Sequence, residues 1–211
     1  MKKFELTNEF ITNMFGTKLF RIRALVEFGD VEAGELGGYV EKESNLGHDD
    51  NAWVYDNAWV YGDAQVSGDA LVYDNARVYG DAQVSGDALV YGNALVCGDA
   101  RVCGDARVCG DARVCGNALV CGDARVCGDA RVCGDARVCG NGDYAYAHGF
   151  GSVNRTTTFF RLKDGGVGVR CGCFYGTLAQ FRDKIRETHG ETKKAQEYLM
   201  LADLMKLRFE K

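Results

Sequence analysis

The sequence predicts an all-β solenoid, a three-sided parallel β-helix with a β cap before it and an α+β cap after it. Two periods carry this prediction. Valine occupies every sixth position from Val54 to Val138, and the segment at 65–82 repeats almost unchanged after eighteen residues. Such strict short periods are typical of solenoid proteins. Because eighteen is three sixes, each turn of the coil should have three sides.

Each side consists of one six-residue rung that reads Ala-x-Val-x followed by a corner of Gly-Asp, Gly-Asn or Asp-Asn. Side chains alternate along a strand, so the Ala and Val residues should point inward and the two x residues outward. Glycine and asparagine suit the corners because they tolerate positive φ. Stacking of the coils then predicts columns of equivalent outward residues at the strand spacing of about 4.8 Å.

The periods divide the chain into three expected parts: an amino-terminal cap with an imperfect first coil at 1–50, the hexapeptide-repeat β-helix at 51–142, and a β-hairpin with two helices at 143–211. An open β-helix end exposes unpaired strand edges, so both ends should carry atypical capping segments.

The amino-terminal cap is expected to contain two short strands, at 3–7 and 18–28. They lead into a coil in which Val40 and Leu46 keep the step of six. Two extra residues before Val54 break that step. The first coil is therefore expected to be irregular.

The carboxyl-terminal part loses the six-residue period. A strand pair joined by a DGG turn is predicted at 156–163 and 167–173. Thr177 and Gln180 have the spacing of a capping box that opens a helix, and Gly190 is typical of a helix end. A second helix is predicted at 192–209, with apolar residues too widely spread for a single stripe.

Composition limits the class of protein. The net charge is −5, yet residues 143–211 carry 12 basic against 8 acidic side chains. The start of the chain lacks the apolar run of a secretory signal, and no stretch approaches the ~20 apolar residues of a membrane helix. We therefore expect a cytoplasmic protein without a membrane contact. The basic tail has no aromatic-basic motif, which disfavours nucleic acid as the partner.

The rungs, in the frame Val-x-Gly-Asp-Ala-x, resemble those of hexapeptide-repeat proteins. That resemblance implies a left-handed coil. Many members are acyltransferases that work as trimers and bind an acyl carrier between coils. The flanking segments at 24–55 and 151–190 look like those of bacterial, phage and prophage hexapeptide proteins that carry a transferase description inferred from fold. Fold alone does not carry function.

An acyltransferase would need a histidine as general base. Among the three histidines, none lies within the repeats, and His148 is the best candidate. Asn154 and Arg155 follow it in a glycine-rich loop suited to an anion. Acetyl-CoA would be the cofactor under this alternative, and no cofactor is expected otherwise.

Eight of the ten cysteines recur at the step of six, so their spacing belongs to the repeat. Tetrahedral zinc needs ligands that converge on a point, whereas a column presents thiols in a line. We expect free thiols in a reducing compartment and no metal site. A redox role for the columns stays open.

The preferred hypothesis is a noncatalytic binding or assembly protein, phage- or prophage-encoded, that forms a homo-oligomer, either a dimer or a trimer, and has a host protein as a further partner. Large amphipathic side chains make binding hot spots. The amino-terminal half of the repeat concentrates such residues at outward positions: Trp53, Tyr55, Trp59, Tyr61, Tyr73, Tyr79 and Tyr91.

Overall fold

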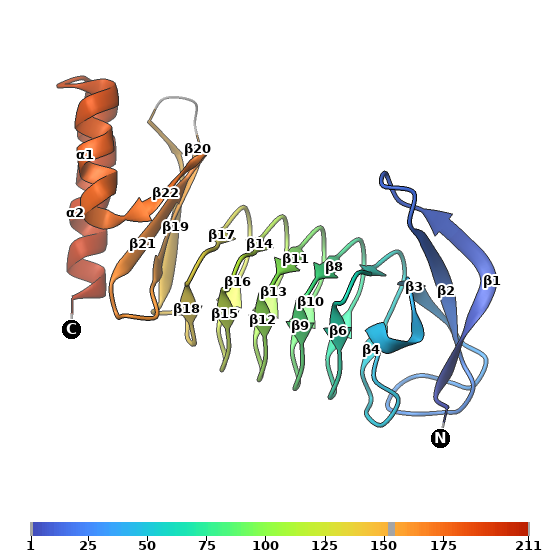
Figure 1. The fold of residues 1–211 in the computed structure, drawn as a ribbon. Coiled ribbons are helices and arrows are strands. Elements are labelled where there is room, and N and C mark those ends of the chain that lie inside the picture. Colours follow the sequence, from blue (N-terminus) through green and yellow to red (C-terminus); the bar gives the residue numbers. More distant parts are fainter. Residues whose placement is uncertain (1, 152–154, 211) are drawn as a thin grey trace.

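The protein is a parallel β-solenoid of about six turns, with an antiparallel sheet at each end and two helices behind the second sheet (Figure 1). This computed structural model describes residues 2–151 and 155–210. The amino terminus lies at one end of the rod and the helices lie at the other. The prediction of a repeat β-solenoid is thus confirmed.

The rungs build three parallel sheets. The first contains β5 (Trp59–Val60), β8 (Arg77–Gly80), β11 (Leu95–Gly98), β14 (Arg113–Val114) and β17 (Arg131–Val132). The second contains β4 (Trp53–Val54), β7 (Leu71–Val72), β10 (Leu89–Val90), β13 (Arg107–Val108) and β16 (Arg125–Val126). The third contains β6 (Gln65–Val66), β9 (Gln83–Val84), β12 (Arg101–Val102), β15 (Leu119–Val120) and β18 (Arg137–Val138).

Every rung pairs in register with the rung eighteen residues later. Val72, for example, is the partner of Val90, which is in turn the partner of Val108. The backbone hydrogen bonds follow the same step, as when Leu71 N donates to the Ala88 carbonyl at 3.0 Å. The eighteen-residue period of the sequence is therefore the repeat of the coil.

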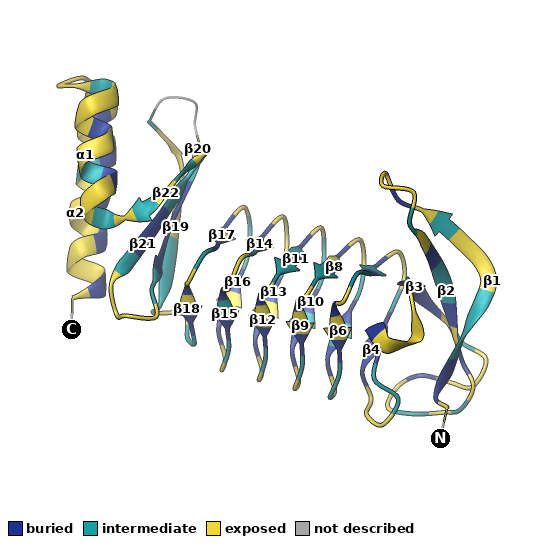
Figure 2. Cartoon of the chain, viewed as in Figure 1, coloured by how far each residue is buried: buried dark blue, intermediate teal, exposed yellow. Residues whose placement is uncertain are grey.

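The core is built from two small residue types. The inward Ala and Val side chains from Ala52 to Val138 are almost without exception fully buried, and they form one continuous cluster along the rod (Figure 2). Burying a valine side chain stabilises a fold by roughly 1.5 to 3 kcal/mol. Alanine at the other inward position lets the walls approach closely, so the interior fills without large side chains.

The amino-terminal segment contains β1 (Phe4–Thr12), β2 (Lys18–Ala24), β3 (Leu36–Val40) and a 3₁₀ turn, η1 (Glu43–Asn45). β1 and β2 form an antiparallel hairpin, and β3 pairs with β2 on one side and with β5 of the solenoid on the other. Val40 lies beside Val60, and Leu46 bridges to Val66. Both inward side chains are buried, and they extend the core into the cap.

The carboxyl-terminal segment forms an antiparallel sheet of β19 (Tyr144–Phe150), β20 (Arg155–Arg161), β21 (Val167–Cys171) and β22 (Phe174–Thr177). The helices α1 (Leu178–His189) and α2 (Lys193–Phe209) pack against it. Thr177 and Gln180 form the predicted capping box, and Gly190 ends α1 at a φ of 56°. β19 and β22 were not expected from the sequence.

Within residues 2–151 and 155–210, no helix is long and apolar enough to cross a membrane.

Candidate functional site

Two columns of stacked tyrosines run along two walls of the solenoid. The ring centroids of Tyr61 and Tyr79 lie 4.9 Å apart at an interplanar angle of 9°, and those of Tyr73 and Tyr91 lie 4.9 Å apart at 2°. Burial is the largest cause that raises the pKa of Tyr79 to about 12. A hydrogen bond with Cys109 is the largest cause that raises the pKa of Tyr91 to about 12. Both columns therefore present neutral phenols at neutral pH.

Trp59 begins a neighbouring column on the same wall as Tyr61 and Tyr79. It lies in register with Arg77 on the next strand, and the guanidinium carbon of Arg77 lies 4.2 Å from the centroid of the indole ring. A cation over an indole face is an attractive arrangement. This wall thus combines aromatic faces with a positive charge.

The hairpin between β1 and β2 ends in a tip with two exposed apolar side chains. Asn13 holds the turn, because its Oδ1 accepts hydrogen bonds from Phe15 N at 2.9 Å and from Thr17 N at 3.0 Å. Met14 is 87% exposed and Phe15 is 80% exposed. Such large apolar side chains at a loop tip are left without an apolar neighbour to cover them.

The tip and the tyrosine wall face each other across a hollow of about 600 Å³, which we call the aromatic groove. Its principal lining residues are Met14, Phe15, Trp59, Tyr61, Arg77 and Tyr79. The aromatic residues of the wall were expected from the sequence, whereas Met14 and Phe15 of the tip were not. The available signal was an apolar Met-Phe pair in the short link between two strands.

Trp53 differs from its expected place on the surface. It is fully buried, with its ring centroid 5.3 Å from that of Phe28 and 6.2 Å from that of Phe4. The cap chain folds over this outward position and covers it. Tyr55 is half-buried beside it, with the ring centroids 6.5 Å apart. Trp53 therefore contributes no exposed contact surface.

The tyrosines of the second column do not line the aromatic groove. Tyr73 and Tyr91 belong to the rungs of β7 and β10, in a different sheet from the strands of the groove wall. The predicted aromatic residues are thus divided between two walls and the cap. Only Trp59, Tyr61 and Tyr79 come together as one lining.

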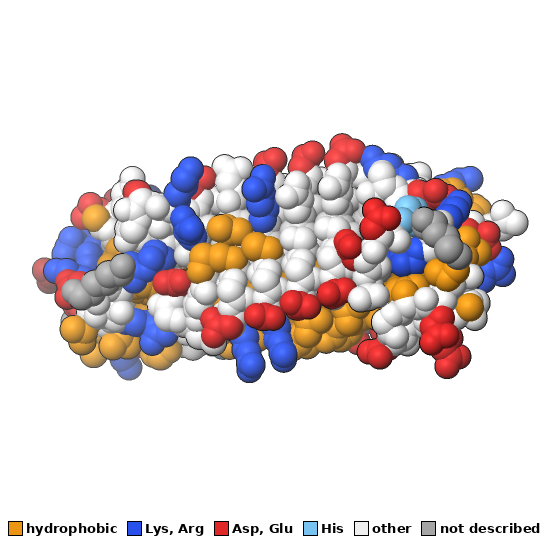
Figure 3. Space-filling model, turned by 90° about the horizontal axis from the view of Figure 1, so that it is seen from below, with side chains coloured by type: hydrophobic (Ala, Val, Ile, Leu, Met, Phe, Trp, Pro, Cys, Tyr) orange, Lys and Arg blue, Asp and Glu red, His pale blue; other side chains and the backbone are white. Residues whose placement is uncertain are grey.

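Charged side chains also follow columns. On the face shown in Figure 3, acidic side chains form rows along the solenoid, and Lys and Arg side chains lie beside them. Some equivalent corner residues of successive coils bond to one another, as when Asn93 Nδ2 donates to Asp111 Oδ1 at 3.1 Å. Exposed contacts of this kind contribute well under 1 kcal/mol each.

A second hollow of about 600 Å³ lies where the carboxyl-terminal sheet meets the solenoid, and we call it the C-terminal cavity. The solenoid supplies Asp111, Arg113, Asp129 and Arg131, and the sheet and its loops supply His148, Arg155, Thr156 and Gly172. His148 and Arg155, singled out from the sequence, therefore line the same cavity. Asn154 lies outside the described residues.

The imidazole of His148 is held at one nitrogen. Its Nδ1 lies 2.8 Å from Thr156 Oγ1 and 4.0 Å from Asp129 Oδ2. β19 supplies His148 and β20 supplies Thr156, and the register between these strands shifts between Ala147 and Phe150. A histidine held through Nδ1 keeps Nε2 available for proton transfer.

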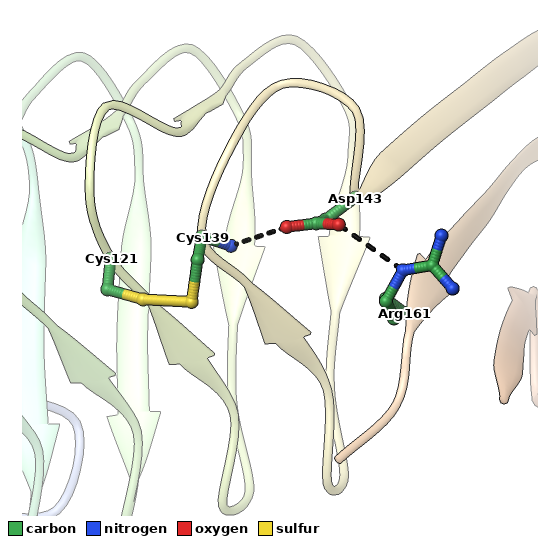
Figure 4. Close-up of a disulfide and its surroundings, with 4 residues drawn as sticks. All are labelled: Cys121, Cys139, Asp143 and Arg161. Atoms are coloured by element: carbon green, nitrogen blue, oxygen red, sulfur yellow. Dashed lines mark hydrogen bonds and ion pairs between the residues drawn. A yellow bond between two sulfur atoms is a disulfide. The ribbon is translucent and has the colours of Figure 1, made fainter. Parts of the chain in front are cut away.

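The expectation of free thiols fails for one pair of cysteines. Cys121 and Cys139, which lie in the same column with Cα atoms 4.4 Å apart, are joined as a disulfide (Figure 4). Asp143 accepts a hydrogen bond from Cys139 N at 3.0 Å and pairs with Arg161 Nε at 3.3 Å. The last coil is thus tied to the coil below it and to the carboxyl-terminal sheet.

The other eight cysteines are free: six in the repeats, together with Cys171 and Cys173 in the carboxyl-terminal segment. Some of the repeat thiols are hydrogen-bonded to the next thiol of their column. Cys115 has opposite effects on its two neighbours. Its hydrogen bond is the largest cause that lowers the pKa of Cys133, and it is also the largest cause that raises the pKa of Cys97. Among the described residues, no three His, Cys, Asp or Glu side chains converge in a group able to hold a metal ion.

Comparison with known proteins bears on the coil. The family model described as YdcK beta solenoid repeat matches residues 64–80, 72–86, 82–98 and 112–128. These segments lie within the solenoid and include neither cap. A search of curated proteins found no match. The repeats are therefore similar to those of a known β-solenoid family, and the similarity concerns the fold.

Proposed function

We propose that this chain is a noncatalytic assembly protein that forms a dimer through the aromatic groove. The observation that carries the proposal is that a projecting apolar tip and an aromatic wall able to receive such a tip lie on the same face of the molecule. Met14 and Phe15 project from the hairpin tip, and Tyr61 and Tyr79 line the wall opposite. A two-fold interface needs a self-complementary patch, because the tip of each copy contacts the wall of the other and both contacts form at once.

The residue types support this use of the groove. Tyrosine, tryptophan and arginine are enriched at binding hot spots, and methionine adapts to irregular surfaces. Trp59, Tyr61 and Arg77 supply the first three on the wall, and Met14 supplies the last on the tip. Covering a fully exposed methionine or phenylalanine is worth roughly 1.5 to 3 kcal/mol.

Further features belong to the same proposal. We assign the coil a left-handed sense and three sides, on the likeness of its rungs to hexapeptide repeats. We also propose that the protein is encoded by a phage or prophage, and that a host protein in the host cytoplasm is its further partner. The near identity of successive Arg-Val-Cys rungs supports a noncatalytic coil, since an active site needs one rung to differ from its neighbours.

The double substitution of Met14 and Phe15 by aspartate tests the dimer. Placing two carboxylates against the tyrosine wall of a second copy removes apolar burial and adds unpaired charge. We expect the dimer dissociation constant to rise by at least about 100-fold, which corresponds to about 3 kcal/mol. Size-exclusion chromatography with light scattering over a micromolar concentration series measures this change.

A matched control uses another pair of exposed apolar side chains. Leu204 and Leu207 on α2 are 55% and 70% exposed and lie outside the groove. Their double substitution by aspartate should leave the oligomeric state unchanged. A wild-type chain that stays monomeric at tens of micromolar, or a control variant that dissociates equally, would contradict the proposed interface.

One observation favours an acyltransferase as a second candidate. His148 lines the C-terminal cavity with its Nδ1 held by Thr156 and near Asp129. In this reaction His148 would take the proton of an acceptor amine or hydroxyl. The acceptor atom would bond to the acyl carbon of acetyl-CoA as the C–S bond breaks and the thiolate leaves.

His148→Ala tests this candidate. Loss of a general base typically lowers a rate by about 10² to 10⁴-fold, so transfer of a labelled acetyl group to an acceptor panel should nearly vanish. His189→Ala, at the end of α1, is the control and should retain activity. Absence of any thermal shift with acetyl-CoA in the wild-type chain would argue decisively against the acyltransferase.

A further inference from the structure

The C-terminal cavity contains a cluster of guanidinium groups from two separate parts of the chain. Arg113 and Arg131 come from consecutive coils, where they are register partners on β14 and β17. Arg155 comes from the start of β20 in the carboxyl-terminal sheet. All three line the same hollow.

The paired arginines stand in an arrangement that is unfavourable by itself. Like charges directly opposite each other on neighbouring strands destabilise a sheet. In the part of the chain that the structure describes, no salt bridge involves Arg113, Arg131 or Arg155. An anion between these groups would relieve their repulsion.

The third guanidinium lies directly against the backbone of Gly172. A Cβ at this residue would lie 1.9 Å from Arg155 Nη1, so a side chain here would displace the end of the arginine. The φ of Gly172 is 58°, a backbone conformation that favours glycine as well. The loop after β21 therefore places Arg155 at the edge of the cavity.

The balance of charge favours a bound anion over a cation. Three guanidinium groups line the cavity against the carboxylates of Asp111 and Asp129. Asp129 already lies 4.0 Å from His148 Nδ1. Guanidinium groups donate two parallel hydrogen bonds to phosphoryl oxygens, which makes arginine well suited to phosphate.

The remaining lining indicates what the phosphoryl group is attached to. The volume of about 600 Å³ is that of a small-molecule site, and it exceeds the need of a lone phosphate ion. Among the described residues that line the cavity there is no phenylalanine, tyrosine or tryptophan, so the large ring on which a nucleobase would stack is not provided. Asp111, Asp129 and Thr156 present oxygens that accept hydrogen bonds from hydroxyl groups.

We infer that the C-terminal cavity binds a small phosphorylated polyol, such as a sugar phosphate. Arg113, Arg131 and Arg155 hold the phosphoryl group, and Asp111 and Asp129 accept hydrogen bonds from hydroxyl groups. This site shares Arg113 with the edge of the aromatic groove, but it needs neither the dimer nor acyl transfer. Binding of a phosphate ester is measured without acetyl-CoA, so it is tested independently of acyl transfer.

Isothermal titration of the full-length chain in phosphate-free buffer tests the site, with glucose 6-phosphate, inorganic phosphate, AMP and glucose as probes. We expect glucose 6-phosphate to bind more tightly than inorganic phosphate or AMP, and glucose to give no heat. The double variant Arg113→Gln/Arg131→Gln should bind glucose 6-phosphate at least about 100-fold more weakly, because two charged hydrogen-bond donors are lost.

The chain supplies a matched control for this variant. Arg107 and Arg125 are also register partners on consecutive coils, on β13 and β16, and they do not line the cavity. Arg107→Gln/Arg125→Gln should keep the wild-type affinity and thermal stability. Equal weakening in both double variants, equal binding of AMP and glucose 6-phosphate, or no heat with any phosphate would overturn the inference.

Discussion

Replacing Asn45 with leucine should lower the free energy of unfolding by about 3 to 6 kcal/mol, although the two side chains have similar volume. Asn45 is fully buried. Its Nδ2 donates to the carbonyls of Gly62 at 3.0 Å and Ala64 at 2.8 Å, and its Oδ1 accepts from Lys42 N at 2.9 Å. Each buried polar group left without a partner costs about 1 to 3 kcal/mol.

The reason lies in how the first coil begins. Within the solenoid, each inward Ala carbonyl accepts a hydrogen bond from the coil before it, as Ala82 does from Gln65 N at 2.9 Å. At the amino-terminal end the backbone N–H of Asn45 donates to the Lys42 carbonyl at 3.1 Å and not to Ala64. The side-chain amide of Asn45 donates to the Ala64 carbonyl instead, and it thereby completes the hydrogen bonding at the end of the sheet that contains β6.

Chemical denaturation measures this change, with Asn51→Leu as the control. Asn51 is exposed and donates to Asp69 Oδ1 at 2.8 Å, so its loss should alter stability by less than about 0.5 kcal/mol. Asn45→Asp should also destabilise, since a carboxylate would face two carbonyl oxygens. Similar unfolding midpoints for the Asn45→Leu and Asn51→Leu proteins would refute the end-closing role.

The titration of Lys3 should increase the free energy of unfolding as the pH rises from 8 to 10. Burial is the largest cause that lowers its pKa from 10.5 to about 8, against the opposing effect of Asp50 and other nearby carboxylates. In this window the unfolded chain binds a proton that the folded chain has lost, so stability increases with pH. With each pKa unit worth about 1.4 kcal/mol, the gain across the window is about 2 kcal/mol.

Lys3 completes the hydrogen bonding at the end of the sheet that contains β4, as Asn45 does for the sheet that contains β6. Its Nζ donates to the carbonyls of Asp50 at 2.6 Å and Ala52 at 2.9 Å, and it lies 4.5 Å from the centroid of the Phe28 ring. The sheet that contains β5 needs no such side chain, because the backbone N–H of Tyr39 in β3 donates to the Ala58 carbonyl at 2.9 Å. At the amino-terminal end of the solenoid, side chains thus complete the hydrogen bonding of two sheets, and the backbone of β3 completes that of the third.

Urea denaturation at pH 7, 8, 9 and 10, compared between wild type and Lys3→Met, isolates this effect. Tyrosine ionisation in the unfolded chain affects both proteins and cancels in the comparison. The stability difference between them should change by about 2 kcal/mol from pH 8 to pH 10. Lys18→Met, at an exposed lysine, controls for the loss of one positive charge. Parallel pH profiles for wild type and Lys3→Met would disprove the role of Lys3.

The candidate sites were only partly accessible to sequence reasoning. Tyr61 and Tyr79 were expected as one column, because strand alternation and an eighteen-residue step suffice to place them. Met14 and Phe15 were missed, since the direction in which a hairpin leans depends on the packing of β2 against β3 rather than on its own residues. Trp53 was assigned to the surface by alternation alone, whereas Phe4 and Phe28 from distant positions cover it.

The sequence by itself determined the coil. Only one register of each rung points Ala and Val inward, and the same rung recurs every six residues. It also determined the bounds of α1, since Thr177, Gln180 and Gly190 act through local hydrogen bonds and backbone conformation. Only the tertiary structure decided how the ends close and where the hollows lie. The aromatic groove and the C-terminal cavity each join a wall of the solenoid to a cap, and contacts between segments so far apart depend on three-dimensional packing that no local pattern encodes.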